Sequence, residues 1–149
     1  MTFTRSPEET MSFAAIFAQS LPPQTVLLLN GDLGAGKTCF VRGLLSGLEG
    51  DANEVHSPTF TIMHEYETTS NNLVLVHIDA YRLSGSDELL TIGWDELLSR
   101  DDVIIAIEWP ERIEDSLPES VIHITIDHVD ETIRKISVQD CSEDSGETP

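Results

Sequence analysis

The sequence contains the octapeptide Gly31-Asp32-Leu33-Gly34-Ala35-Gly36-Lys37-Thr38. It matches the phosphate-binding pattern G-x-x-x-x-G-K-[ST]. The apolar residues 26–29 directly before it have the composition of a buried strand, and residues 39–45 after it have the apolar spacing of a helix. A strand, a glycine loop and the start of a helix are the setting that the pattern requires. The chain has only two lysines, so a chance match is improbable.

The residue types of this stretch suit a nucleotide triphosphate and its metal. Glycines let backbone N–H groups point at phosphate oxygens without a Cβ in the way. The helix that follows adds free N–H groups and the positive end of its dipole. In this pattern Lys37 reaches the β- and γ-phosphates, and the Thr38 hydroxyl ligates Mg²⁺. The expected nucleotide contacts within the loop are Asp32, Leu33, Gly34, Ala35, Gly36, Lys37 and Thr38.

Composition limits the possible classes of protein. A chain of 149 residues with 40% hydrophobic content is long enough for one domain with its own core. No apolar run approaches the roughly 20 residues of a membrane span, and residues 1–7 have no signal pattern, so we expect a cytoplasmic protein. Two cysteines predict neither a disulfide framework nor a zinc site. The net charge of −19 argues against DNA binding and requires a partner protein or a local basic patch for any role near RNA.

The chain opens with a predicted helix. Ser6 is the expected N-cap, Pro7 the first helical residue, and Glu9 the acid that reaches back to complete a capping box. Apolar residues with helical spacing then follow Thr10 on one face. We interpret this as a packing helix, and a contact from Thr10 to the nucleotide is the alternative.

Two buried-type strands end in a carboxylate. Residues 73–79 end in Asp79 and residues 103–108 end in Glu108. Ligands of open α/β sheets bind at the carboxyl ends of strands, so either acid could hold Mg²⁺ directly or through water. The alternative for each is a solvated acid at a strand end. With two such acids, we expect at least one at the metal.

The remaining segments complete an α/β plan. Residues 60–67 alternate as a strand and pair antiparallel with 73–79 through a short link. A helix starts near residue 84 and can be split by Gly93, and residues 121–127 and 132–138 predict a hairpin. Residues 139–149 are small, polar and acidic, which predicts a disordered tail after a single domain of residues 1–138. The fold class we predict is a P-loop NTPase-like three-layer sandwich with a mixed parallel and antiparallel sheet.

Four blocks in this order resemble the TsaE family, also called YjeE. They are the octapeptide, Ser57-Pro58-Thr59-Phe60-Thr61, His77-Ile78-Asp79-Ala80-Tyr81-Arg82-Leu83 and Glu108-Trp109-Pro110. The likeness covers nearly the whole chain. Members of the family are small bacterial ATPases of the pathway that makes the threonylcarbamoyl modification of a tRNA adenosine.

The resemblance implies roles for particular residues. Thr59 would sense the γ-phosphate from a switch-like loop, and Asp79 would position water or metal in a second one. Glu108 would be the Walker B-type carboxylate on Mg²⁺, and Trp109 would lie near the nucleotide pocket. Cys39 stands where the family often has threonine, and its backbone N–H can still contact the α-phosphate. Tyr81 and Arg82 would belong to the surface used with partners.

The resemblance also implies ligands and partners. ATP and ADP with Mg²⁺ would be the cofactors, and hydrolysis would drive or reset a complex of TsaB-like and TsaD-like proteins. Contact with tRNA would occur only indirectly, through that complex. The sequence leaves open whether His77, which shares a strand face with Asp79, is a core histidine or a functional one.

Two other functions remain compatible with the loop. A small-molecule kinase uses the same motif, although the chain is short for an acceptor-binding lid and has no Arg-rich lid segment. The second alternative is a non-hydrolytic module that binds a nucleotide to control an interaction with another protein. The lysine, the threonine and the two candidate acids favour hydrolysis.

Overall fold

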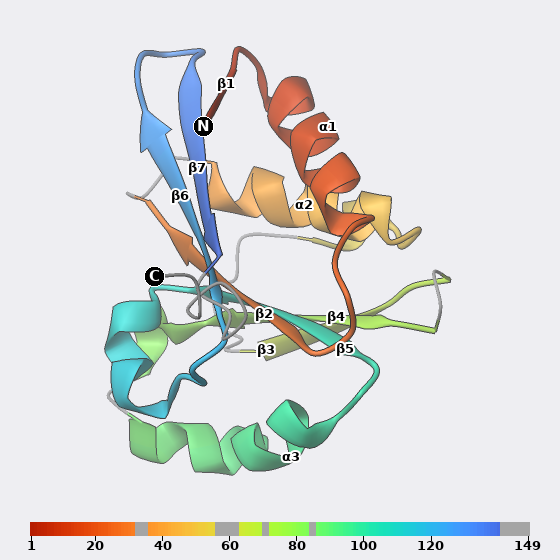
Figure 1. Ribbon diagram of the computed structural model, residues 1–149, viewed down its shortest axis with the longest axis vertical. Coiled ribbons are helices and arrows are strands. Elements are labelled where there is room, and N and C mark those ends of the chain that lie inside the picture. Colours follow the sequence, from red (N-terminus) through yellow and green to blue (C-terminus); the bar gives the residue numbers. More distant parts are fainter. Residues whose placement is uncertain (32–35, 56–62, 70–71, 84–85, 141–149) are drawn as a thin grey trace, which may run out of the picture.

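The computed structural model describes residues 1–31, 36–55, 63–69, 72–83 and 86–140. Within them, seven strands form one sheet in the order β1-β7-β6-β2-β5-β4-β3 (Figure 1). The strands are β1 (Thr2–Thr4), β2 (Thr25–Asn30), β3 (Met63–Glu67), β4 (Val74–Asp79), β5 (Val103–Glu108), β6 (Ile122–His128) and β7 (Arg134–Asp140). Strand β2 is parallel to β5 and β6, and β5 is parallel to β4. The outer strands β3, β7 and β1 pair antiparallel, which confirms the predicted mixed sheet.

Helices cover both faces of the central strands. Helices α1 (Pro7–Ala18) and α2 (Lys37–Gly47) lie on one face, and α3 (Trp94–Ser99) with the 3₁₀ segments η3 (Ser86–Ile92) and η4 (Pro110–Ser116) lies on the other (Figure 1). Neighbouring side chains of a strand point to opposite faces, so Leu27 and Leu29 join the core under α1 and α2, while Leu28 joins the core under α3. This arrangement confirms the three-layer prediction. Among the described residues, no helix is long and apolar enough to cross a membrane.

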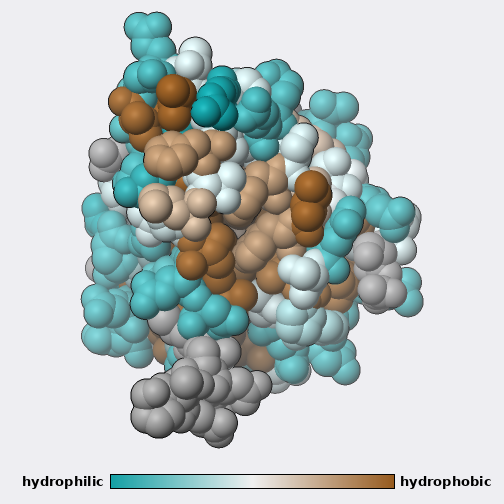
Figure 2. Space-filling view, turned by 45° about the horizontal axis from the view of Figure 1, so that its top comes forward, coloured by the Kyte–Doolittle hydropathy of each residue, from teal (hydrophilic) through white to brown (hydrophobic). Residues whose placement is uncertain are grey.

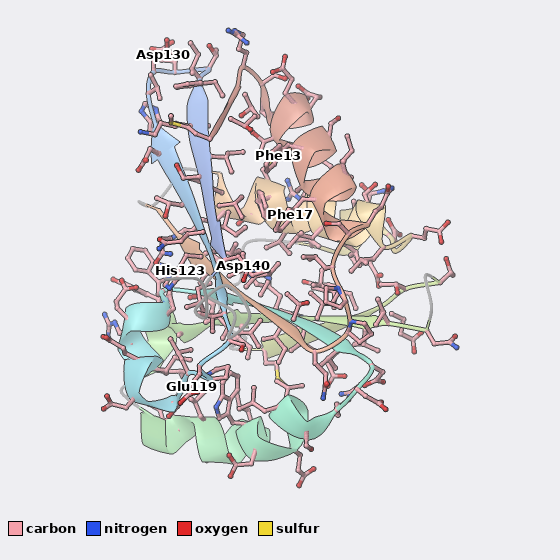
Figure 3. The ribbon with its side chains drawn as sticks, viewed as in Figure 1. Phe13, Phe17, Glu119, His123, Asp130 and Asp140 are labelled. Atoms are coloured by element: carbon pink, nitrogen blue, oxygen red, sulfur yellow. The ribbon has the colours of Figure 1, made fainter. Side chains whose placement is uncertain are left out.

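The first helix begins where the sequence predicts, but the capping box differs from the prediction. Among the described hydrogen bonds, the Glu9 side chain accepts from the Arg5 backbone N–H over 2.9 Å, one residue before the predicted partner Ser6. The Glu9 backbone N–H donates to Ser6 Oγ over 3.0 Å, and Pro7 occupies the first turn, where its missing N–H costs nothing. Figure 3 shows Phe13 and Phe17 on the side of α1 toward α2. Their ring centroids lie 6.3 and 6.2 Å from that of Phe40 on α2. The apolar face of α1 therefore holds the helix that begins at the phosphate loop.

Three segments differ from the prediction. Strand β1 was not predicted, because three residues are too short to show a period. The expected helix after residue 84 is a 3₁₀ segment and a short α-helix, separated by Gly93 at φ +77°, a conformation that costs least for glycine. Strand β7 continues to Asp140, whose partner is Ile122, so the strand includes two residues that we predicted in the tail. The tail from residue 141 lies outside the described residues.

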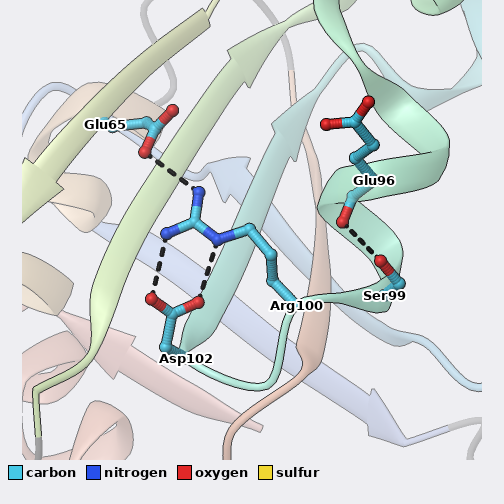
Figure 4. A network of polar contacts seen from close by, with 5 residues as sticks. All are labelled: Glu65, Glu96, Ser99, Arg100 and Asp102. Atoms are coloured by element: carbon cyan, nitrogen blue, oxygen red, sulfur yellow. Dashed lines mark hydrogen bonds and ion pairs between the residues drawn. The ribbon is translucent and has the colours of Figure 1, made fainter.

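An ion-pair network joins the edge strand β3 to the residues just before β5 (Figure 4). Arg100 donates from Nε and Nη2 to the two oxygens of Asp102, over 2.9 and 3.0 Å, and from Nη1 to Glu65 on β3 over 3.1 Å. These hydrogen bonds raise the pKa of Arg100, and the bond from Arg100 lowers the pKa of Asp102. The network lies at the amino end of β5, whereas the candidate site lies at the carboxyl ends of the strands. We therefore assign the network to stabilisation of the sheet and not to the site.

The face drawn in Figure 2 is mainly hydrophilic, and apolar residues gather in a patch on it. The large apolar residues that are exposed in the described chain are Met1, Phe3, Ile16, Tyr81, Val129 and Val138. Acidic residues outnumber Lys and Arg by 27 to 8, and few of them are buried. The negative charge is therefore carried at the surface.

Candidate functional site

The candidate site lies at the carboxyl ends of three adjacent parallel strands. Leu29 on β2 is in register with Glu108 on β5, and Glu108 is in register with Asp79 on β4. Both acids alternate with residues of the α3 side, so they lie on the face that α2 covers. Strand β2 ends at Asn30, directly before Gly31, and helix α2 begins at Lys37. The two predicted acids and the predicted phosphate-loop lysine therefore belong to one edge of the sheet.

Lys37 is the first residue of α2 and is 5% exposed. Gly36 before it has φ +112°, and a Cβ there would meet only Ile126 at 4.0 Å, so the need for glycine is conformational. The ammonium Nζ of Lys37 donates to the Gly31 carbonyl over 2.7 Å. It also lies 3.9 Å from the centroid of the Trp109 ring, a cation–π distance. The amine is thus held across the loop, between its first residue and an aromatic face.

Trp109 adopts the left-handed conformation, with φ +58° and ψ +51°. This conformation costs a residue with a Cβ about 1–2 kcal/mol. Its ring packs on Tyr81, with centroids 5.1 Å apart, and the Arg112 guanidinium lies 5.0 Å from the Tyr81 ring. Strained backbone of this kind concentrates at functional sites. The turn directs Trp109 from the end of β5 back onto Lys37.

A pocket of about 290 Å³ adjoins Lys37 and Trp109. Its lining residues are Leu29, Asn30, Gly31, Lys37, Trp109, Glu111, Thr125 and Asp127. We predicted Lys37 and Trp109 near a nucleotide, but not Asn30 or the two residues of β6. No local pattern marks Thr125 and Asp127, because they reach the site only through the parallel pairing of β6 with β2. His123 on β6, labelled in Figure 3, lies within 3.5 Å of Asn30 at the same strand pair.

The two acids differ in their surroundings. Glu108 is 5% exposed, and its Oε2 lies 2.5 Å from Nε2 of His77, which is 2% exposed. Asp79 is half-buried and accepts a hydrogen bond from the Tyr81 backbone N–H over 3.0 Å. Glu108 is therefore an enclosed carboxylate with a histidine partner, whereas Asp79 also caps the turn that carries Tyr81.

The other residues that we predicted to contact the nucleotide differ in how deeply they are buried. Thr38 is half-buried in the first turn of α2. Cys39 donates from Sγ to the Pro7 carbonyl over 3.1 Å, and burial raises the pKa of its thiol. Thr10 is buried, with its hydroxyl 2.7 Å from that of Thr4, and it is not among the residues that line the pocket. The predicted contacts Asp32, Leu33, Gly34, Ala35 and Thr59 lie outside the described residues.

The donor set fits Mg²⁺ together with a phosphate. In the part of the chain that the structure describes, no three His, Cys, Asp or Glu side chains gather into a site that could hold a metal by themselves. Mg²⁺ is usually held by one or two carboxylates and by substrate phosphates, with water completing its shell. The Thr38 hydroxyl and the carboxylates of Glu108 and Asp79 are hard oxygen ligands of the kind it prefers. The rest of the coordination would come from the phosphates and from water.

Comparison with known proteins gives one family. The family model described as threonylcarbamoyl adenosine biosynthesis protein TsaE matches residues 4–136. The TsaE protein of Bacillus subtilis is 41% identical over 134 residues, which cover 90% of this chain and 81% of that protein. The TsaE protein of Rickettsia felis is 38% identical over 138 residues, which cover 93% and 78%.

The fold gives the same result. The crystal structure of Bacillus subtilis YdiB matches with a TM-score of 0.75 and 33% identity, over 96% of this chain and 86% of that one. This similarity supports the P-loop NTPase-like fold class. The chain therefore belongs to the TsaE family, whose role is the biosynthesis of threonylcarbamoyladenosine in tRNA.

Proposed function

We propose that this chain is a Mg²⁺-dependent ATP hydrolase that supports the threonylcarbamoyl modification of tRNA by driving or resetting a complex of TsaB-like and TsaD-like proteins. ATP and water are the substrates, and ADP and inorganic phosphate are the products, because water attacks the γ-phosphorus and the bond to the β-phosphate oxygen breaks. The transfer of the threonylcarbamoyl group belongs to the partners. Because the chain carries a net charge of −19, we assign the tRNA contact to the partner complex.

One observation carries the proposal. Lys37 begins the helix after the glycine loop, and the acids Glu108 and Asp79 end neighbouring strands on the face that this helix covers. A lysine and a hydroxyl at the start of one helix, with a carboxylate at the end of a neighbouring strand, are parts that phosphoryl transfer requires in P-loop proteins. Family membership supports the same assignment.

The side chains have distinct roles in this mechanism. The Lys37 ammonium leaves the Gly31 carbonyl and binds the β- and γ-phosphates, where it stabilises the charge that develops in the transition state. Thr38 and Glu108 would hold the metal, and Asp79 would help to hold it or orient the attacking water. Mg²⁺, when bound, neutralises charge on the phosphate oxygens. Trp109 closes the site beside Lys37 and excludes water from the ammonium.

The surface that we assign to the partners, around Tyr81, lies beside the carboxyl ends of the central strands. Tyr81 is 54% exposed and packs on Trp109, which contacts Lys37. A partner that covers Tyr81 would therefore be two side chains away from the phosphate-binding amine. We expect the hydrolysis rate to rise when such a partner binds.

The test is ATP hydrolysis with and without the TsaB and TsaD homologues. Lys37→Ala should lower the rate by on the order of 10²-fold or more, because it removes a donor aimed at the transition state. Lys135→Ala is the matched control, since it removes the only other lysine of the chain, on β7. Glu108→Gln keeps an acceptor for His77 but removes the charge for the metal, so it should lose Mg²⁺-dependent hydrolysis and remain folded.

Wild-type rates in both Lys37→Ala and Glu108→Gln would refute the proposal. Tight nucleotide binding without turnover, alone and in the complex, would instead favour the non-hydrolytic module. A rate that does not change when the partners are added would refute the role assigned to them.

A further inference from the structure

His77 and Glu108 form a buried polar pair at the candidate metal site. They are 31 residues apart in the chain, and their Nε2 and Oε2 atoms are 2.5 Å apart. The histidine side chain is 1% exposed and the glutamate side chain 7%. Neither residue needs the other for strand formation, so the contact calls for an explanation of its own.

The sheet register explains how the two residues meet. His77 on β4 lies opposite Ala106 on β5, and Glu108 is two positions further along β5 on the same face. Neighbouring strands lie about 4.8 Å apart, so a residue two positions further along the next strand is within reach of long side chains. The small side chain of Ala106, which is fully buried, leaves room for the imidazole to reach along the strand to Glu108.

The chemistry of the two side chains indicates which one donates the hydrogen bond. An ionised carboxylate has only acceptors, so it pairs with the form of His77 that carries a hydrogen on Nε2, and this N–H donates to Oε2. A carboxylate taken out of water is costly unless it gains such a donor. One oxygen of Glu108 is thus engaged by His77, which orients the other oxygen for a metal.

We propose that His77 is a positioning residue that holds the Glu108 carboxylate in the orientation in which it binds the metal of the nucleotide complex. This inference rests on the proposed function, because it concerns the same metal site. Outer-shell hydrogen bonds of this kind orient metal ligands, and their loss typically lowers metal affinity or activity by about 10–100-fold. His77 itself touches neither metal nor nucleotide.

The test measures how much Mg²⁺ tightens nucleotide binding. Calorimetry of the purified chain with a non-hydrolysable ATP analogue gives one affinity in excess Mg²⁺ and another in EDTA. In His77→Leu the ratio of the two affinities should fall by about tenfold, while the affinity in EDTA stays at the wild-type value. In His77→Gln the side-chain amide can donate from nearly the place of Nε2, so the ratio should return to within about threefold of wild type.

Two further variants keep the result interpretable. His64→Leu is the matched control, because His64 on β3 is the register partner of His77 and has no hydrogen bond to Glu108 among the described contacts. If thermal unfolding shows that His77→Leu does not fold, His77→Asn replaces it, since the shorter amide cannot reach Oε2.

The possible outcomes distinguish the positioning role of His77 from the proposed function of the chain. A wild-type ratio in folded His77→Leu or His77→Asn overturns the positioning role and leaves the proposed function intact. Equal losses in Mg²⁺ and in EDTA, without rescue by His77→Gln, show a purely structural histidine and also overturn it. A wild-type chain whose nucleotide affinity does not respond to Mg²⁺ overturns the proposed function as well.

Discussion

Replacing Gly47 by alanine should destabilise the protein, although alanine is the better helix former. Gly47 lies in α2 where α1 crosses it, and a Cβ on Gly47 would lie 2.7 Å from Ala15 Cα and 2.8 Å from the Ala15 carbonyl carbon. These atoms belong to the backbone, so no side chain can turn aside, and α1 must move by several tenths of an ångström. Gly43, one turn earlier, meets Met11 and Ala14 in the same way. The two glycines thus allow α1 to approach the phosphate-loop helix closely.

The magnitude follows from two opposing terms. Overpacking at a contact without room costs about 1–3 kcal/mol, and a backbone obstacle places Gly47 at the upper end. Alanine regains about 1 kcal/mol of helix propensity over glycine. The net loss is therefore about 1–2 kcal/mol, which lowers the melting temperature of a domain of this size by about 3–8 °C.

Thermal unfolding followed by circular dichroism measures the effect. Ser46→Ala is the matched control, because Ser46 is exposed in the same helix and gains propensity without a new contact. It should raise the stability slightly, by up to about 0.5 kcal/mol. A melting temperature of Gly47→Ala equal to or above that of wild type would show that the α1–α2 contact is not as close as described.

Two further predictions concern parts of the fold away from the site. Asp102→Asn should lower the stability at pH 7, because the Arg100 hydrogen bond holds the pKa of this carboxyl below its usual 3.8. A carboxyl whose pKa is lower in the folded state than in the unfolded state stabilises the fold at pH values above its unfolded-state pKa. This stabilisation is lost as the pH falls through the folded-state pKa. Melting temperatures of variant and wild type should therefore converge as the pH falls below 3.8 and through the folded-state pKa, and a gap that does not narrow over this range would contradict the assignment. Ser6→Ala should cost about 1 kcal/mol in urea unfolding, because Glu9 loses its capping acceptor, and an unchanged midpoint would count against the cap.

The central strands were predictable because each carries a continuous apolar run. Residues 103–108 match β5, and β2 extends the predicted 26–29 by one residue at each end. The antiparallel pairs β3–β4 and β6–β7 follow from short polar links between strand patterns. Parallel pairing has no such local signal. The insertion of β2 between β5 and β6 depends on contacts across the whole chain.

The segments that were missed depend on tertiary contacts. Strand β1 has three residues, and it is held by pairing with β7 and by the bond between Thr4 and Thr10. The extra length of β7 comes from its pairing with β6, which overrides a polar composition typical of a tail. Gly93 was noted as a possible break, and its positive φ separates η3 from α3.

The site was predictable in its residue types but not in its pairings. The loop pattern identified Lys37 and Thr38, and strand ends identified Asp79 and Glu108. The contact between His77 and Glu108 depends on register, which a single sequence does not encode locally. The turn of Trp109 onto Lys37 likewise requires a left-handed residue that no propensity favours for tryptophan.

The central claim is that this edge of the sheet binds a nucleotide through Lys37 with Mg²⁺. Titration calorimetry of the wild-type chain and of Lys37→Ala with ADP and a non-hydrolysable ATP analogue, in Mg²⁺ and in EDTA, tests it most directly. We predict one site per chain, tighter binding with Mg²⁺, and loss of binding in Lys37→Ala. The absence of any nucleotide uptake by the folded chain, alone or assembled with its TsaB-like and TsaD-like partners, would contradict the account.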